Sequence, residues 1–459
     1  MEYISLVMFA VVCLVLMAGY PVAFSLAGTA LLFASVGIIT GTFDGSYLGA
    51  LPNRIFGIMN NQTLLAVPLF VLMGVMLEKS QVAEKLLTSM GQLMGRVKGG
   101  LAIAVVMVGM LLAASTGIVG ATVVTMGLLS LPTMLKRGYK ASFATGTICA
   151  TGTLGQIIPP SIALVLLGDV LSSAYQQAQM KMGIFSPDTV SVGDLFAGAI
   201  VPGLILVCCY LLYVFFMSWL SKDTINQDLS EQDLDSEPLL KVALFKALVP
   251  PLLLIIAVLG SILLGLATPT EAAGVGAFGA SLLAFTQGKM NKQVMAEVVQ
   301  STLKITCMVF MILIGASVFS LVFRGFGGED LIHEMFTNMP GGPVGAMLVV
   351  MLVVFLLGFI LDFIEITFVV VPIVGPVLLA MGFDPVWLGI MFAVNLQTSF
   401  LTPPFGFALF YLRGVAPATV PTREIYKGVA PYIAIQVLVL IAIAIWPQLV
   451  TWLPDQIYN

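Results

Sequence analysis

The chain has 459 residues, of which 59% are hydrophobic and only 9% are charged, and its formal net charge is −4. No soluble domain has this composition, so we expect a polytopic membrane protein. The small negative charge offers no basic face for nucleic acid. A lone histidine, His333, excludes histidine-based catalysis and a histidine metal cluster. The five cysteines lie in apolar segments without metal-ligand spacing, and we expect small buried side chains.

The first part of the chain alternates apolar runs with polar loops. Runs at 4–18, 22–39 and 52–77 predict three membrane segments, and the first, which lacks a positive n-region, is expected to be retained. A polar, basic stretch at 79–98 follows. Residues 99–135 are apolar but interrupted at Ser115-Thr116-Gly117 and Gly120-Ala121-Thr122. This predicts a re-entrant hairpin with a hydroxyl-rich tip; one long tilted helix is the alternative.

A proline pair interrupts the next apolar segment, at about 143–171. Residues 152–168 read GTLGQIIPPSIALVLLG. Each proline lacks an N–H and disfavours helical geometry in the residue before it, so the helix should break before Pro160 and restart near Ser161. Non-helical backbone at membrane depth is tolerated where protein groups or water in a cavity form hydrogen bonds with its N–H and C=O groups. Such sites hold ions and polar substrates. A proline-kinked helix without a ligand is the simpler alternative.

Polar stretches divide the chain into halves. Residues 172–194 form a polar insertion, and 195–220 predict a span. The segments at 4–39 and 195–267 carry few polar residues at membrane depth, and we expect them to form the scaffold around a mobile transport domain. The most hydrophilic stretch follows and predicts a cytoplasmic linker at 221–242, which separates a first repeat at 1–220 from a second at 243–459.

The second half repeats the plan of the first. It has spans at 243–267, 270–286 and 304–323, a polar connector at 324–341, a hairpin at about 343–382 with its tip at 361–367, a broken helix at about 386–413 and a last span at 429–452. We therefore expect an all-α membrane protein with about 11 transmembrane helices and two re-entrant hairpins.

Internal spacing supports the repeat. Aligning Pro159 with Pro403 gives an offset of 403 − 159 = 244 residues, and the distances from Thr122 to Pro159 (159 − 122 = 37) and from Thr367 to Pro403 (403 − 367 = 36) nearly agree. The basic loops are at 79–98, 136–140, 222–246, 289–304 and 413–427. Placing all five in the cytoplasm gives a consistent path with both termini outside, and the halves then have inverted topology.

Few residues at membrane depth carry chemistry. Asp362 and Glu365 lie on the second tip and could ligate a cation, although a helix cap is the alternative. Glu271, in the first turn after Pro269, is expected to be structural. The tips and breaks otherwise carry neutral oxygen donors, which suit sodium and predict two related sites. Any one hydroxyl could instead bond its own helix backbone. These donors are Ser115, Thr116, Thr122, Thr153, Ser161, Thr367, Thr398 and Thr402.

The ordered motifs resemble the large membrane subunit of the tripartite ATP-independent periplasmic (TRAP) transporters. The resemblance runs through nearly the whole chain. It rests on LLAVPLFVLMG at 64–74, KGGLAIA at 98–104, GTLGQIIPPSIALVL at 152–166, TPTEAAGVGA at 268–277, the hairpin around Asp362, and LTPPFGFALF at 401–410. It implies an elevator-type, sodium-coupled importer of small organic anions in a bacterial inner membrane. It also implies a small four-helix membrane subunit and a periplasmic binding protein as partners.

The tip and break regions of the family carry over to this sequence, with sodium as coupling ion and no other cofactor. The residues assigned to sodium are Ser115, Thr116, Gly117, Thr122, Gly152, Thr153, Gly155, Pro159, Asp362, Thr367, Gln397, Thr398, Thr402 and Pro403. Those assigned to substrate are Gln156, Pro160, Ser161, Glu365, Pro404 and Gly406. One departure concerns the first tip, where Ile118 and Val119 follow Gly117 and many relatives have a Gly-Ser-Ser sequence.

Other function classes fit less well. No Walker motif is present, so transport must use an ion gradient. A stand-alone anion/sodium carrier without a binding protein is the runner-up. An intramembrane enzyme would need a nucleophile with a base, and the lysines lie in loops. A passive channel is disfavoured by two hairpin and broken-helix units.

Overall fold

The computed structural model describes residues 3–80, 82–94, 98–220 and 237–458. Throughout these ranges the regular structure is helical and no strand occurs, which confirms an all-α membrane protein. Five helices are long and apolar enough to cross a membrane, and a bent pair, α16 (Phe363–Val369) and α17 (Val371–Ala380), gives a sixth. The predicted eleven crossings would depend on the shorter apolar helices as well.

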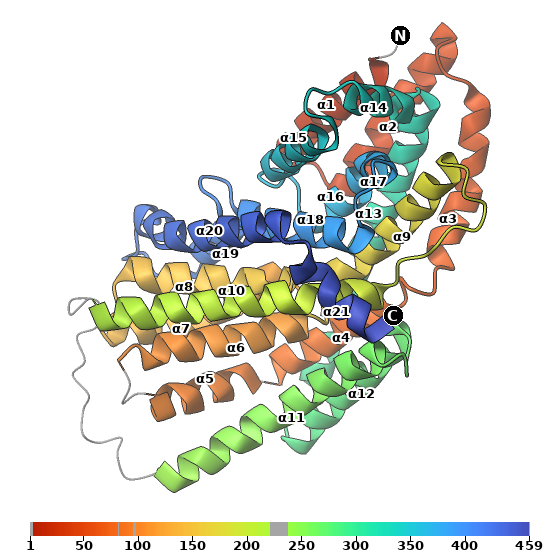
Figure 1. The fold of residues 1–459 in the computed structure, drawn as a ribbon. Helices are drawn as coiled ribbons and strands as arrows, with labels where there is room; N and C mark the ends of the chain where they lie inside the picture. Colours follow the sequence, from red (N-terminus) through yellow and green to blue (C-terminus); the bar gives the residue numbers. More distant parts are fainter. Residues whose placement is uncertain (1–2, 81, 95–97, 221–236, 459) are drawn as a thin grey trace.

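One group of helices runs from α1 and α2 at one end of the molecule to α11 and α12 at the other, and contains the long helix α13 (Figure 1). At 34 residues, α13 would span about 50 Å. It packs against α2, α3 and α4, and α4 packs in turn against α12, which pairs with α11. This first group contains α1 (Ile4–Met17), α2 (Val22–Thr40), η1 (Gly45–Ala50), α3 (Leu51–Met59), α4 (Ala66–Lys79), α11 (Glu237–Leu263), α12 (Pro269–Thr286) and α13 (Lys292–Gly325).

A second group contains the two predicted hairpins and both broken helices. Its pairs include α8 with α20, α7 with α8, α9 with α17, and α6 with α8. Its members are α6 (Gly100–Thr116), α7 (Val119–Lys136), α8 (Ala141–Thr153), η3 (Leu154–Gln156), α9 (Ile162–Lys181), α10 (Val192–Leu220), α15 (Gly342–Leu357), α16, α17, α18 (Pro385–Leu401), α19 (Phe407–Val415), α20 (Thr422–Ile445) and α21 (Gln448–Tyr458).

Two short amphipathic helices connect the groups. The helix α5 (Val82–Leu93) contacts α11 in the first group and α6 in the second. The helix α14 (Gly328–Thr337) contacts α13 in the first group and α15 and α17 in the second. Adding the 244-residue offset to 82–93 gives 326–337, so the two connectors occupy corresponding positions in the halves.

The same offset relates the elements of the second group. Ala141, the first residue of α8, corresponds to 141 + 244 = 385, the first residue of α18. Equivalent contacts recur: α6 packs on α8 as α15 packs on α18, and α7 packs on α19 as α16 and α17 pack on α9. Peptide bonds Pro159–Pro160 and Pro403–Pro404 are both cis. The internal repeat is therefore a property of the fold as well as of the sequence.

Several predicted segments have different bounds, among them the span at 304–323, which is part of the longer α13. The run at 52–77 is divided into α3 and α4 by a turn at residues 60–65. The polar insertion at 172–194 is helical as far as Lys181, because α9 continues through it. The last span begins at Thr422 and ends at Ile445, and α21 follows as a separate helix. Residues 221–236 of the predicted linker lie outside the described residues.

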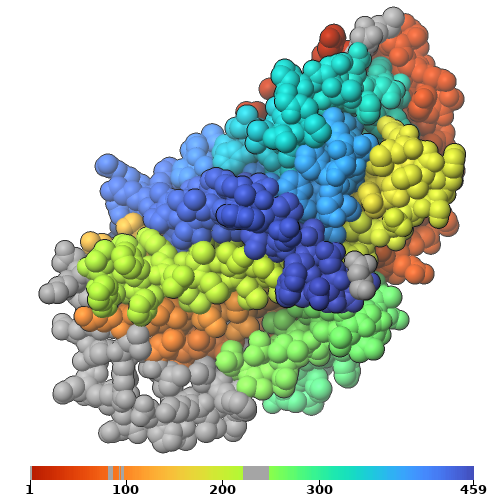
Figure 2. All heavy atoms as spheres, in the orientation of Figure 1, coloured from red at the N-terminus to blue at the C-terminus, as the bar shows by residue number. Residues whose placement is uncertain are grey.

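Two further predictions were wrong. The segment 195–220 was expected to group with 4–39 in a scaffold, but α10 packs against α6, α18, α20 and α21. Figure 2 shows the C-terminal helices lying directly on α10. The cysteines were expected to be buried, and only Cys149 is; Cys208 and Cys307 are exposed on helices suited to a lipid environment. The apolar context predicts bilayer depth and does not distinguish protein from lipid contact.

Glu271 has the structural role expected of it. Its side chain accepts a hydrogen bond from the backbone N–H of Thr268, at 2.8 Å, and the Thr268 hydroxyl accepts one from the N–H of Glu271. These bonds form a capping box at the start of α12.

Candidate functional site

The first tip is a tight turn between α6 and α7. Gly117 ends α6 with φ +61°, and a Cβ there would lie 2.9 Å from the backbone nitrogen of Ile162, at the start of α9. Only glycine fits both the left-handed backbone and this approach. The tip also abuts α4, because a Cβ on Gly74 would lie 2.8 Å from the Ser115 carbonyl oxygen. The turn at Gly117 and Ile118 thus lies between the first break and a helix of the first group.

The hydroxyls of the first tip have partners in their own hairpin. Ser115 and Thr116 each donate to the Leu112 carbonyl at 2.9 Å. The Thr116 and Thr122 hydroxyls are 2.8 Å apart, and Thr122 can also donate to the Ile118 carbonyl. All three side chains are buried. Their lone pairs still leave each oxygen able to accept a further bond or to ligate a cation.

The first break lies between α8 and α9. The helix α8 ends at Thr153, one turn of 3₁₀ helix covers Leu154–Gln156, and α9 begins at Ile162. The Ser161 hydroxyl donates to the Gly155 carbonyl at 2.9 Å, which fixes the loop around the prolines. A Cβ on Gly155 would lie 3.5 Å from the Ala113 carbonyl oxygen, so the first tip and the first break are in contact.

At the second tip, Asp362 is the N-cap of α16. Its carboxylate accepts from the backbone N–H of Phe363 at 2.7 Å, and Glu365 accepts from the N–H of Asp362 at 2.9 Å. These two residues form a capping box. The structure therefore supplies donors for both carboxylates, as the capping alternative requires. The Thr367 hydroxyl, fully buried in the same helix, has no hydrogen-bond partner in the described part of the chain.

The second break lies between α18 and α19. The Thr398 and Thr402 hydroxyls donate to the carbonyls of Val394 and Thr398, four residues back, at 2.8 and 2.7 Å. Gly406 is the N-cap of α19, and the Pro404 carbonyl accepts from the Tyr426 hydroxyl at 3.2 Å. The peptide bond between Pro403 and Pro404 is the second cis bond.

The two breaks meet at one polar contact. The Gln397 amide nitrogen donates to the Thr153 hydroxyl at 3.4 Å, and these residues are separated by 397 − 153 = 244, the repeat offset. Equivalent residues of two repeats touch where the pseudo-symmetry axis passes between them. Gly152 lies beside this contact, with a Cβ position 2.2 Å from the Val123 side chain, so α8 packs closely on α7.

Sequence reasoning missed two residues of this cluster. Gln436 of α20 is fully buried and donates to the Tyr210 hydroxyl of α10 at 2.8 Å, and its amide nitrogen is 3.5 Å from the Thr153 hydroxyl. Gln436 is an isolated polar residue within the long apolar run at 429–452, and its position at membrane depth could have marked it as a candidate site residue. Tyr210 offered no comparable signal, because tyrosine is common in membrane helices.

Some of the buried side-chain oxygens without a hydrogen-bond partner belong to the tips, the breaks and the Gln436 contact, and others, such as those of Ser5 and Thr302, lie elsewhere. Among the described residues, those of the tips, the breaks and this contact include the amide oxygens of Gln156, Gln397 and Gln436 and the Thr367 hydroxyl. An unsatisfied buried acceptor costs about 1–3 kcal/mol, so such atoms usually have a water or cation partner. Neutral oxygens of this kind fit sodium.

Comparison with known proteins identifies the family. Residues 7–449 match the family described as "Tripartite ATP-independent periplasmic transporter, DctM component". The chain belongs to this family. The C4-dicarboxylate TRAP transporter large permease protein of Vibrio cholerae is 30% identical over 97% of this chain and 96% of its own length. The sialic acid TRAP transporter large permease protein of the same organism is 28% identical over 96% of each chain.

A solved structure extends the likeness of this DctM-family chain to the fold. The YdaH transporter of Alcanivorax borkumensis has a TM-score of 0.58 and 16% identity, and the match covers 97% of this chain and 99% of that one. The relatives are named as transporter permeases and not as enzymes. The chain is therefore a multi-pass membrane permease of the TRAP family.

Asp362 provides a test of the second tip. Since Asn and Asp are comparable N-caps, Asp362→Asn should change stability by less than about 0.5 kcal/mol, whereas Asp362→Ala should lose about 1 kcal/mol. Under the sodium coupling proposed below, Asp362→Asn is expected to keep the sodium activation curve of the unaltered protein, measured as uptake against sodium concentration. A tenfold weaker sodium response in Asp362→Asn, with normal thermal unfolding, would instead identify Asp362 as a sodium ligand.

Proposed function

We propose that this permease is the large subunit of a sodium-coupled importer that moves a small organic anion by an elevator mechanism. The observation that carries the proposal is the paired site. Two broken helices meet at Thr153 and Gln397, with a hairpin tip against the first break and buried oxygens that lack donors. Organic acids named for its relatives, a C4-dicarboxylate and a sialic acid, support the substrate class.

The arrangement of the two helix groups supports the elevator. A mobile body must hold the whole site, and the tips and breaks all belong to the second group. If the groups move as units, α16 must slide along α13, and α6 and α9 along α4, while α5 and α14 connect the groups at corresponding positions. Small residues such as Gly74 line the surface between the groups, which permits close backbone approach.

Exposed apolar residues indicate where lipid or a membrane partner would lie. On α2 these include Phe24, Leu32 and Ile39, which are 66%, 68% and 85% exposed. We assign this surface to the bilayer of the bacterial inner membrane and to the small four-helix subunit that TRAP systems imply. The binding protein would deliver substrate on the side opposite the basic loops.

Sodium dependence is the first test of this function. Proteoliposomes that contain the permease, its small subunit and its binding protein are expected to accumulate radiolabelled substrate under an inward sodium gradient. A panel of succinate and N-acetylneuraminate covers the two acids named for the relatives. Unchanged uptake in sodium-free buffer under a proton gradient would contradict the coupling. Equal uptake without the binding protein would favour the stand-alone carrier.

A further inference from the structure

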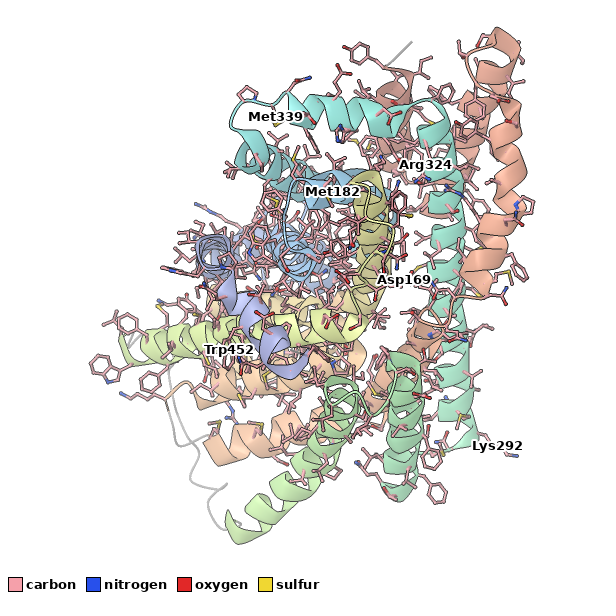
Figure 3. All side chains as sticks on the ribbon, turned by 45° about the vertical axis from the view of Figure 1, so that its right-hand side comes forward. Asp169, Met182, Lys292, Arg324, Met339 and Trp452 are labelled. Carbon is pink, nitrogen blue, oxygen red and sulfur yellow. The ribbon has the colours of Figure 1, made fainter. Side chains whose placement is uncertain are left out.

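A polar cavity of about 570 Å³ lies between the two helix groups and reaches α16, the helix of the second tip, at Phe368. Residues of α3, α9, α13, α16 and α17 line it, and none of the residues assigned above to sodium or substrate does. Its charged and amide side chains are Arg54, Asn61, Asp169, Gln176, Gln177 and Arg324. Figure 3 shows Arg324 and Lys292 at opposite ends of α13, with Asp169 between α9 and α13.

The cavity exists because α9 is longer than its repeat counterpart. The helix α9 has 20 residues and α19 has nine. The added turns come from the polar insertion that begins at residue 172. They place Ser173, Gln176, Gln177 and Met180 along the cavity, at the spacing of one helix face. The opposite face, with Leu171 and Ala178, is buried. The insertion therefore builds one wall of the cavity.

Glu329 fixes this wall to the first group. One of its oxygens accepts from Nε and Nη2 of Arg324, at 2.9 and 2.6 Å. The other oxygen accepts from the Gln177 amide at 3.2 Å and lies 3.7 Å from the Lys181 ammonium. The charge of Arg324 is thus already balanced by a carboxylate.

Arg54 has no such balance. Its hydrogen bond in the described structure is a long one, 3.5 Å from Nη1 to the Ser317 carbonyl, and no ion pair of Arg54 is formed within the described ranges. The nearby carboxylate of Asp169 accepts from the Asn61 amide at 2.9 Å. A guanidinium has five donors in a planar fork that matches a carboxylate. Arg54 and Arg324 thus share one close carboxylate, Glu329, which is hydrogen-bonded to Arg324, and the unused donors of Arg54 suit a further anion.

We propose that this cavity is an entry site for the transported anion, in which Arg54 binds a carboxylate and the Ser173–Gln177 face of α9 contacts the rest of the molecule. The identity of the anion as a transported substrate rests on the proposed function. The cavity lies toward the Arg324 end of α13, opposite the basic loop around Lys292. With the basic loops in the cytoplasm, it faces the side on which a binding protein releases its cargo.

Charge-selective labelling tests the anion site without transport. In a chain with the exposed Cys208 and Cys307 replaced by serine, a cysteine is placed at Ser173, inside the cavity, or at Phe185, which is 96% exposed in the loop after α9. The rate of cysteine modification at each position is measured with two methanethiosulfonate reagents, an anionic one that carries a sulfonate and a cationic one that carries a trimethylammonium group. The anionic preference should be about fivefold higher at position 173 than at 185. It should vanish with Arg54→Gln and persist with Arg54→Lys.

Uptake then shows whether the site serves transport. Arg54→Gln is expected to raise KM about tenfold with little change in maximal rate, equivalent to about 1.4 kcal/mol of lost binding. Arg423→Gln, on the exposed surface at the start of α20, is the matched control and should leave KM unchanged. Equal labelling ratios at 173 and 185 would overturn the anion site, whether or not the protein transports. A normal KM in Arg54→Gln would overturn its role in entry, and absence of sodium-driven uptake in the unaltered protein would instead count against the proposed function.

Discussion

Gly146→Ala is expected to destabilise the protein by about 3 kcal/mol or more, the upper end of the usual cost of overpacking. A Cβ on Gly146 would lie 2.0 Å from the carbonyl oxygen of Gly428, and one on Gly428 would lie 1.9 Å from the carbonyl of Ser142. The obstacle is backbone on both sides, so no side-chain rotation relieves it. The helices α8 and α20 would have to separate, and α8 ends at the first break.

The measurement is thermal unfolding of the detergent-purified protein, followed by tryptophan fluorescence. Gly28→Ala in α2 is the matched control, because no atom lies within 4 Å of its Cβ position. Gly28→Ala should be as stable as the unaltered protein or slightly more stable, because alanine has a higher helix propensity than glycine. Equal unfolding temperatures for Gly146→Ala and the unaltered protein would show that α8 and α20 do not approach as closely as described.

The sequence was sufficient to locate both breaks and the repeat. Neither proline of a pair can donate a helical hydrogen bond, whatever packs around it. The breaks at 154–161 and 402–406 contain the pairs Pro159-Pro160 and Pro403-Pro404. The offset of 244 residues also predicted which elements correspond. It could not predict that equivalent residues, Thr153 and Gln397, would touch, because that depends on where the axis lies.

Helix grouping could not be read from the sequence. The segments 4–39 and 195–220 have similar apolar composition, yet α2 packs on α13 and α10 packs on α6, α18 and α20. In a membrane, lipid and protein surroundings are both apolar, so hydropathy does not select a partner. The break between α3 and α4 was missed for a different reason. It contains no proline before Pro68, and the polar residues Asn60, Asn61 and Gln62 were its only signal.

Prediction of the cavity would have required both the polarity of the sequence and the packing of the helices. The polar character of residues 172–181 was visible, but a polar run in a membrane protein is usually a loop. The helix continues because its buried face, which includes Leu171 and Ala174, packs on α17. The sequence did not single out Arg54 as a ligand-binding residue, because a single arginine near the end of a membrane segment is common at the membrane–water interface.

A cross-link between the two helix groups is expected to stop transport almost completely. The helix α16, in the group that holds the tips and breaks, packs against α13 of the other group. Ser320 of α13 and Phe368 of α16 both line the cavity between the groups. If the second group moves as a rigid body during each cycle, a short bismaleimide joining cysteines at 320 and 368 would hold it in one position.

The matched control joins two residues of the moving group away from the cavity. Ser191, just before α10, and Tyr458 of α21 are both exposed and both lie beside Gly193, and α10 and α21 pack together. Cysteines at 191 and 458, linked by the same reagent, should leave uptake largely intact, because both ends would travel together. A reagent with a reducible centre should allow dithiothreitol to restore uptake in the 320–368 pair. Full uptake with the 320–368 pair quantitatively cross-linked would mean that α13 and α16 do not move apart. The substrate would then have to cross by rocking or by gating around a fixed site, and the elevator would be excluded.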